Sequence, residues 1–311
     1  PSMLGPVLAE RLMRGLRRHL RLQPDYEWTC EANPGSADLA TLQAYCDHGV
    51  NRLSFGVQAV QDHHLRWLGR VHDAAAAEAA LQRARALAPR VSADLIIGLP
   101  GQRDDEIDDN LRFVRRHALD HVSVYHLMIE PGTEFAARHR RGELHPADEE
   151  QGLRHLERIA DGLAAIGLQA YETSNFAIPG QACRHNLAYW TGRDYQAAGA
   201  GAVSTIDDLR LTREPHPARY IAAITAGGDA IWKREKLGPA ERLTECWMLG
   251  LRLATGVSQA ALASHGDDPA RWRPIADGLV TAGLLHEDDG YLALTRRGRM
   301  VQDAVTVQLL P

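Results

Sequence analysis

Apolar and polar residues follow one another in blocks that predict strands and helices in regular succession. Strands are expected at 27–32, 50–57, 91–99, 121–127 and 168–171. Helices are expected at 3–20, 38–48, 74–88, 105–116 and 149–166, where apolar residues recur at helical spacing. Strands that alternate with helices of this length predict an α/β fold with a parallel sheet, curled or open.

The pattern changes after about residue 205. Residues 172–204 contain many glycine and polar residues and are expected to form loops and turns, while residues 218–311 are expected to be mainly helical. Within the last part, 272–310 reads as helix, strand, turn, strand and helix, which is a winged-helix-like order. We therefore expect two domains, at 1–205 and 206–311.

Composition limits the classes of protein that remain. The chain has 311 residues, of which 45% are hydrophobic, and this is enough for one large core and a smaller domain. It contains no run of 18 apolar residues and begins with no secretion signal, so a cytoplasmic location is expected and no transmembrane segment. The net charge of −5 favours no nucleic-acid partner.

Lysine and cysteine usage excludes several kinds of chemistry. Lys233 and Lys236 are the only lysines, which argues against Schiff-base and P-loop sites. The four cysteines stand singly, without a C-x-x-C pair, so neither a zinc site nor a redox dithiol is predicted. We expect free thiols, mostly buried, and no disulfide framework.

Two carboxylates in the expected strands are candidates for ligand binding. Glu31 ends a strand before Asn33 and Pro34, so it either accepts hydrogen bonds from a ligand or serves as a surface acid in a cap or ion pair. Asp94 lies inside an otherwise apolar strand, where an unpaired charge is costly. It therefore needs either a ligand or a structural ion-pair partner.

Further candidates follow the second expected strand. Gln58 offers a donor and an acceptor at the strand end, and Gly56 permits a close approach of the backbone. Arg70 could hold a carboxylate in a bidentate fork, although exposed arginines without a ligand are far more common. The polar and aromatic residues between 175 and 190 belong either to a packed lid or to a ligand site; they are Asn175, Arg184, His185, Asn186, Tyr189 and Trp190.

Seven segments in order resemble one family. They are Glu31-Ala-Asn-Pro-Gly, Gly49-Val-Asn-Arg-Leu-Ser-Phe-Gly-Val-Gln, Leu68-Gly-Arg-Val-His, Asp94-Leu-Ile-Ile-Gly-Leu-Pro-Gly-Gln, Ile129-Glu-Pro-Gly-Thr, Tyr171-Glu-Thr-Ser-Asn-Phe-Ala and His185-Asn-Leu-Ala-Tyr-Trp. Together they resemble the radical S-adenosylmethionine (radical SAM) proteins of the oxygen-independent coproporphyrinogen III oxidase group. The fifth and seventh segments resemble its HemW-type haem chaperones rather than the oxidases.

The resemblance implies a partial, six-stranded, TIM-type β/α barrel that binds S-adenosylmethionine and a 4Fe-4S cluster. By position, Glu31, Gln58, Arg70 and Asp94 match residues that contact S-adenosylmethionine, and Met128 and Val203 match positions that flank it. His185 is implied as a residue of a haem site. The implied partners are haem or another tetrapyrrole and a haem-acceptor protein.

The chain departs from the family at the cluster motif, because the C-x-x-x-C-x-x-C loop is absent. The residues Pro1 and Ser2 match the end of a Gly-Gly-Thr-Pro-Ser motif, so the loop is expected upstream of residue 1. Three readings stay open: an N-terminally truncated HemW-type protein, a cluster-free haem- or tetrapyrrole-binding protein, and a coproporphyrinogen III oxidase. From these residues alone we expect no bound metal and no radical catalysis.

Overall fold

The computed structural model describes residues 1–144 and 148–311 and divides into two compact units, Pro1–Ala182 and Cys183–Pro311. The boundary predicted from the sequence lies later, after residue 205. Residues 183–205 belong to the second unit because the helix at 184–190 and the strand that begins at residue 203 pack against other elements of that unit. Among the described residues, no helix combines the length and apolar character that a membrane span requires.

The first unit is built on a six-stranded sheet in the order β1-β2-β3-β4-β6-β5. Its strands are β1 (Thr29–Ala32), β2 (Arg52–Gln58), β3 (Arg90–Ile97), β4 (His121–His126), β5 (Gln169–Ala170) and β6 (Asn175–Ala177). The neighbours β1 to β4 are parallel, whereas β6 is antiparallel to both β4 and β5. The expected parallel sheet is therefore confirmed for its first four strands.

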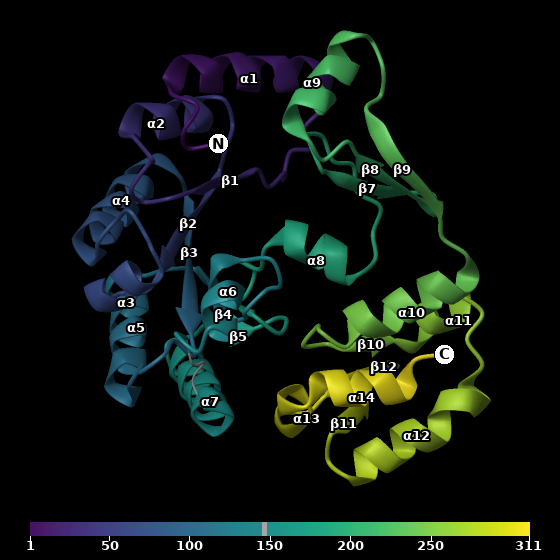
Figure 1. Ribbon diagram of the computed structural model, residues 1–311. Coiled ribbons are helices and arrows are strands. Elements are labelled where there is room, and N and C mark those ends of the chain that lie inside the picture. The colour runs from purple at the N-terminus through teal and green to yellow at the C-terminus, as the bar shows by residue number, and fades with distance from the viewer. Residues whose placement is uncertain (145–147) are drawn as a thin grey trace. The chain divides into compact units, whose positions relative to one another are not determined.

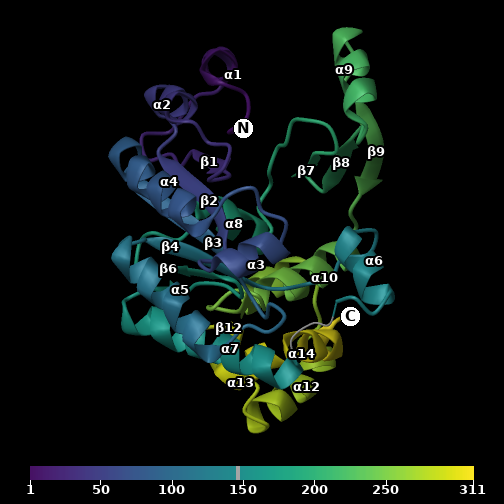
Figure 2. The same cartoon turned by 60° about the vertical axis from the view of Figure 1, so that its left-hand side comes forward.

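The described part of the first unit contains seven helices, most of which pack against one face of the sheet (Figures 1 and 2). They are α1 (Pro6–His19), α2 (Leu39–Asp47), α3 (Asp62–Trp67), α4 (Ala74–Leu87), α5 (Asp104–Arg116), α6 (Glu134–Arg140) and α7 (Glu149–Ala165). Local sequence sets where they begin: Asp38 accepts a hydrogen bond from the Thr41 amide at 2.9 Å, and Asp73 caps α4 at 2.8 Å. The sequence analysis missed the short helices α3 and α6.

Alternation along the strands separates an apolar face from a polar one. Residues such as Leu53, Phe55, Val91 and Leu95 form the buried core together with the inward sides of α2, α4, α5 and α7. The intervening residues point to the other face and are mostly polar.

The second unit contains two small antiparallel sheets and seven helices among its described residues. The sheet β7-β8-β9 is made of Val203–Ile206, Leu209–Arg213 and Ile231–Lys236, and the sheet β10-β12-β11 of Val257–Ser258, Tyr291–Leu294 and Leu285–Asp288. The helices are α8 (Arg184–Trp190), α9 (Pro217–Thr225), α10 (Pro239–Gly250), α11 (Gln259–Ser264), α12 (Pro269–Thr281), α13 (Arg296–Met300) and α14 (Gln302–Leu309), of which α13 is one short turn. Trp247 and Trp272 meet edge to face at the centre of its core, with ring centroids 5.5 Å apart.

The expected helix-strand-turn-strand-helix order of the last part is confirmed by α12, β11, β12, α13 and α14. Two expectations were wrong. Residues 172–204 are not only loops, because they include β6 and α8, and β9 lies within 218–311, the region expected to be mainly helical. Strands of three to six residues with mixed polar character give little periodic signal, so the sequence pattern did not show them.

Candidate cofactor site

The polar face of the first sheet brings Glu31 and Asp94 together with three serines. Glu31 on β1 lies opposite Ser54 on β2, and Asp94 on β3 lies opposite Ser123 on β4. The Ser54 and Ser92 hydroxyls are 2.7 Å apart and link β2 to β3. The residues that alternate with the core positions thus form a continuous polar surface across four strands.

Asp94 is partly buried on this surface, and burial raises the pKa of its carboxyl group. The Ser123 and Ser54 hydroxyls donate to the carboxylate and lower its pKa, while the Glu31 charge raises it and the Arg52 charge lowers it. Among the described residues, Asp94 has hydroxyl partners rather than an ion-paired arginine. Of the two alternatives that the sequence left open for Asp94, the structure therefore does not show the structural ion pair.

Gln58 and Arg70 converge at the carboxyl end of β2. A Cβ atom placed on Gly56 would lie 2.7 Å from Gln58 Nε2 and 3.5 Å from Arg70 Nη2, so both side chains reach over this glycine. Gln58 has a φ of 69°, and it pairs with Leu95, the residue after Asp94. Gln58 therefore lies beside β3, with Arg70 next to it, and burial lowers the pKa of the Arg70 guanidinium.

The remaining predicted residues fall in different places. Met128 follows β4 and is 72% exposed. Val203 begins β7 and His185 is the second residue of α8, so both belong to the second unit. The first unit by itself therefore holds two pairs: Glu31 and Asp94 share the polar face of the sheet, and Gln58 and Arg70 meet at the carboxyl end of β2, the edge at which parallel α/β folds bind ligands.

Sequence reasoning missed the polar residues that surround this group. Tyr125 on β4 is one of them, and burial raises the pKa of its hydroxyl, with further contributions from the charges of Asp94, Glu172 and Glu31. Polar residues recur at every second position in 52–58, 92–94 and 121–125. In the strands of an expected parallel sheet, this period of two was a usable signal for a polar surface.

The surface has a defined chemical preference. Three carboxylates, Glu31, Asp94 and Glu172, act on Tyr125 through their charges, so they share one region of negative potential. Such a region suits an ammonium or sulfonium group and accepts hydrogen bonds from a ribose diol. The guanidinium of Arg70 offers the opposite preference, for a carboxylate.

The second unit holds a separate cavity of about 950 Å³ between α8, β7, β8 and α10. Its walls include the aromatic side chains of Tyr189, Trp190 and Tyr195 and the thioether of Met248. His185 packs edge to face on Tyr189, with ring centroids 4.8 Å apart. The predicted aromatic cluster therefore forms one wall of a cavity, and this size is at the upper end of the range for cofactor sites, roughly 300–1,000 Å³.

The four cysteines do not fit an iron–sulfur site. Burial raises the pKa of Cys30, Cys46 and Cys246 to about 11, which favours the thiol over the thiolate that binds iron. Cys183 is buried in the other unit from Cys30 and Cys46. In the described parts of the chain, no cysteine joins a group of three metal-ligating side chains.

Comparisons with known proteins agree with this architecture. Residues 1–114 match the Radical SAM superfamily and residues 237–301 match the HemN C-terminal domain. The solved structure of the coproporphyrinogen III oxidase HemN from Escherichia coli superposes with a TM-score of 0.84 over 100% of this chain and 75% of its own, at 22% identity. This likeness confirms the fold class, a radical-SAM-type α/β fold followed by a mainly helical C-terminal part.

Curated relatives define the family more closely. The heme chaperone HemW of Mycobacterium tuberculosis is 37% identical over 100% of this chain and 78% of its own length. HemW of Bacillus subtilis is 32% identical over 98% of this chain and 82% of its own, and HemW of Escherichia coli is 33% identical over 96% and 79%. The chain therefore belongs to the HemW family within the radical SAM superfamily.

Proposed function

We propose that this protein binds haem in the cavity of its second unit and delivers it to an acceptor protein in the cytoplasm. Its curated relatives are named heme chaperones, and the chain aligns with them over nearly its whole length. The observation that carries the proposal is the lining of the cavity, because it combines flat aromatic walls with cationic rims and groups that ligate haem iron.

The cavity offers what a haem requires. Tyr189 and Tyr195 and the Met248 thioether are residue types that serve as axial ligands in haem proteins, and His185 lies against Tyr189. Arg193, Arg210 and Arg242 line the same cavity and suit the two propionate groups. Arg210 already pairs with Glu245 at 2.7 Å, while among the described residues Arg193 has no ion-pair partner.

We further propose that the polar face of the first unit binds S-adenosylmethionine. Glu31 and Asp94 would accept hydrogen bonds from its ammonium group and its ribose, and Arg70 with Gln58 would hold its carboxylate at the end of β2. Met128, which follows β4 in the same unit, would flank it. In radical SAM relatives a cluster supplies the electron for sulfonium cleavage, but the cysteines described above do not fit one, so this proposal is confined to binding.

The haem proposal is tested by titrating the purified protein with haemin and following the Soret band. We expect saturable binding of one haemin per chain. Met248→Glu places a carboxylate in the cavity wall and is expected to weaken haemin binding at least tenfold. Val307→Glu is the matched control, since Val307 is also an exposed apolar side chain of this unit but lies outside the cavity lining.

His185→Ala separates a ligand from a packing residue. If the imidazole binds the iron, the Soret maximum of the complex shifts; if it only supports Tyr189, the maximum stays and the affinity falls modestly. Failure of the wild-type protein to bind haemin overturns the haem proposal. Equal affinity of the wild type and Met248→Glu overturns the assignment to this cavity.

A further inference from the structure

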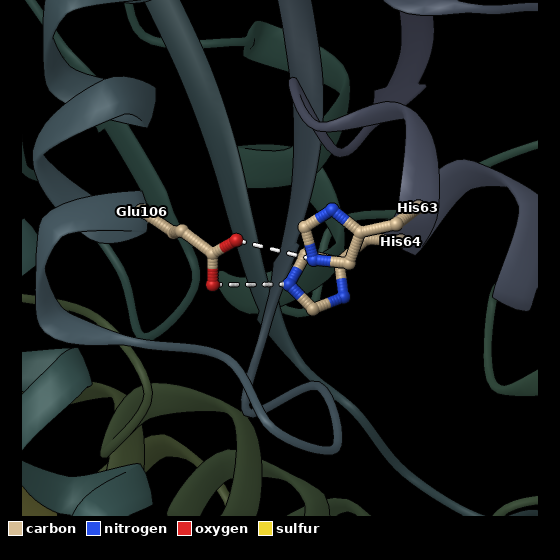
Figure 3. A group of neighbouring side chains, drawn as sticks. All are labelled: His63, His64 and Glu106. Carbon is tan, nitrogen blue, oxygen red and sulfur yellow. Dashed lines mark hydrogen bonds and ion pairs between the residues drawn. The ribbon is translucent and has the colours of Figure 1, made fainter.

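Two adjacent histidines of α3 face one carboxylate of α5. His63 Nε2 lies 3.1 Å from Glu106 Oε1, and His64 Nε2 lies 3.3 Å from Glu106 Oε2, as Figure 3 shows. All the ligating atoms of the three residues lie within 4.8 Å of one another. Among the described residues, this is the one group of three or more histidine, cysteine, aspartate or glutamate side chains with such a spacing.

Hydrogen bonding accounts for only one of the two carboxylate oxygens. Glu106 Oε2 accepts from the Arg103 amide at 2.8 Å and also contacts His64. Glu106 Oε1 is fully buried and has no hydrogen-bond partner in the described structure, although His63 Nε2 lies 3.1 Å from it. The Arg103 guanidinium reaches it only as an ion pair at 3.5 Å.

This donor set is that of a borderline transition-metal ion. Two imidazole nitrogens and one carboxylate oxygen are ligands of tetrahedral Zn²⁺ sites with an open fourth position. Bonds of about 2.0 Å at tetrahedral angles place donor atoms about 3.3 Å apart. The separations observed here, 3.1 Å and 3.3 Å, run from the two imidazole nitrogens to different oxygens of one carboxylate, which can turn to present either oxygen to an ion. His63 is half-exposed, whereas His64 and Glu106 are buried, so one side of the group is open to solvent.

We propose that His63, His64 and Glu106 bind a divalent transition-metal ion of the Zn²⁺ class, which joins α3 to α5. The Arg103 amide then holds the ligating carboxylate in place, as a second-shell donor does in established sites. The proposal is independent of haem and S-adenosylmethionine binding.

The bound ion would fix the segment that carries Arg70. The last turn of α3 leads through Leu68 and Gly69 directly to Arg70, whose amide donates to the Leu65 carbonyl at 2.9 Å. A link from α3 to α5 therefore restrains the backbone on which the Arg70 guanidinium is mounted. We assign the ion a structural role at the edge of the polar face.

Zinc binding is measured on the full chain after removal of metals with a chelator. Wild-type protein is expected to take up one Zn²⁺ at this site, and a hundredfold excess over the dissociation constant should raise the Tm by about 5–10 °C. Glu106→Gln and His64→Gln should each lose most of this shift. His63→Ala changes only a half-exposed side chain, so it tests the site even where a buried variant fails to fold.

His155→Gln is the matched control. His155 is a buried histidine of α7, and its Nε2 lies 3.1 Å from the carboxylate of Asp104, which is on α5 like Glu106. Its replacement therefore breaks a similar histidine–carboxylate pair without changing the proposed ligands. This variant should lose stability yet keep the full zinc-dependent shift. Replacing Zn²⁺ by Co²⁺ should give tetrahedral absorption bands without the charge-transfer band of a cysteine thiolate. An unchanged zinc shift in His63→Ala, or a thiolate band, overturns the proposal.

Discussion

Burial raises the pKa of the Asp94 carboxyl group, and the charge of Glu31, two strands away on the same face, raises it further. The cost of this arrangement is partly offset by hydroxyl donors from Ser123 and Ser54. Carboxylates kept close together in a folded protein without a bound cation destabilise it, and sites arranged in this way commonly serve a ligand. Replacement of Asp94 therefore separates the effect of this carboxylate on ligand binding from its effect on stability.

Replacing Asp94 by Asn should stabilise the protein and impair ligand binding. Because the native pKa of this acid is raised, the unfolded chain gives up the proton more readily, and stability falls as pH rises from about 3.9 through the native value. At pH 8 we expect Asp94→Asn to gain about 1 kcal/mol in the free energy of unfolding. Urea denaturation measures the gain.

The same variant should bind S-adenosylmethionine at least tenfold more weakly, as measured by calorimetry, because it removes one acceptor charge. Glu149→Gln, an exposed acid at the start of α7, is the control and should change neither quantity. Asp94→Asn protein that is less stable at pH 8 and binds normally would show that this carboxylate has only a structural role.

Gly56→Ala should weaken S-adenosylmethionine binding while leaving the fold intact. The added Cβ atom would lie 2.7 Å from Gln58 Nε2, the end of a flexible side chain, so Gln58 moves rather than the strand. We expect a loss of affinity of about tenfold, the value of one hydrogen bond to a charged group. Gly15→Ala in α1, where a Cβ atom meets nothing within 4 Å, should bind as the wild type does.

His121 should make the first unit sensitive to mild acid. Burial and then the charges of Arg52 and Arg90 lower the pKa of His121 to about 2, and its Nε2 lies 2.8 Å from the Tyr171 hydroxyl. In the unfolded chain the His121 imidazole therefore binds a proton at about pH 6.5, whereas in the folded protein it stays neutral at that pH. The contribution of neutral His121 to the free energy of unfolding is fully present above pH 6.5 and is lost progressively as the pH falls toward 2.

The expected loss is about 1.4 kcal/mol per pH unit for one proton, measured by urea denaturation between pH 6.5 and 5. His121→Gln should make this slope shallower by most of that amount, because glutamine keeps a polar group near Tyr171 without titrating. His19→Gln changes an exposed histidine of α1 and should leave the slope as in the wild type. Equal slopes for all three proteins would contradict the assignment.

Gly298 is expected to be essential to the core of the second unit. A Cβ atom on it would collide with the Leu284 carbonyl, which is rigid backbone at the start of β11. Gly298→Ala should therefore destabilise the unit by about 1–3 kcal/mol. Gly278→Ala in α12 meets nothing within 4 Å and should instead stabilise it by up to about 1 kcal/mol. Thermal unfolding of both variants measures the difference.

Sequence alone was sufficient for much of the first unit. Apart from the short helix α3, the helices and parallel strands from α1 to β4 agree with the periodicity to within a few residues. Each of them buries one face against a neighbour, and local caps such as those of α2 and α4 set where helices begin. The ordered motifs from Glu31 to His185 also identified the family, which the relatives confirm. These features depend on the order of residues in short segments.

Tertiary structure decided which side chains meet. Gln58 and Arg70 are twelve residues apart and meet over Gly56 because the chain returns through α3, and His63 and His64 reach Glu106 only because α3 packs near α5. The serines around Asp94 come from three strands, and their alignment depends on strand register. Local periodicity records which face a residue occupies, whereas its neighbours on that face depend on contacts between distant segments, and these form only when the chain folds.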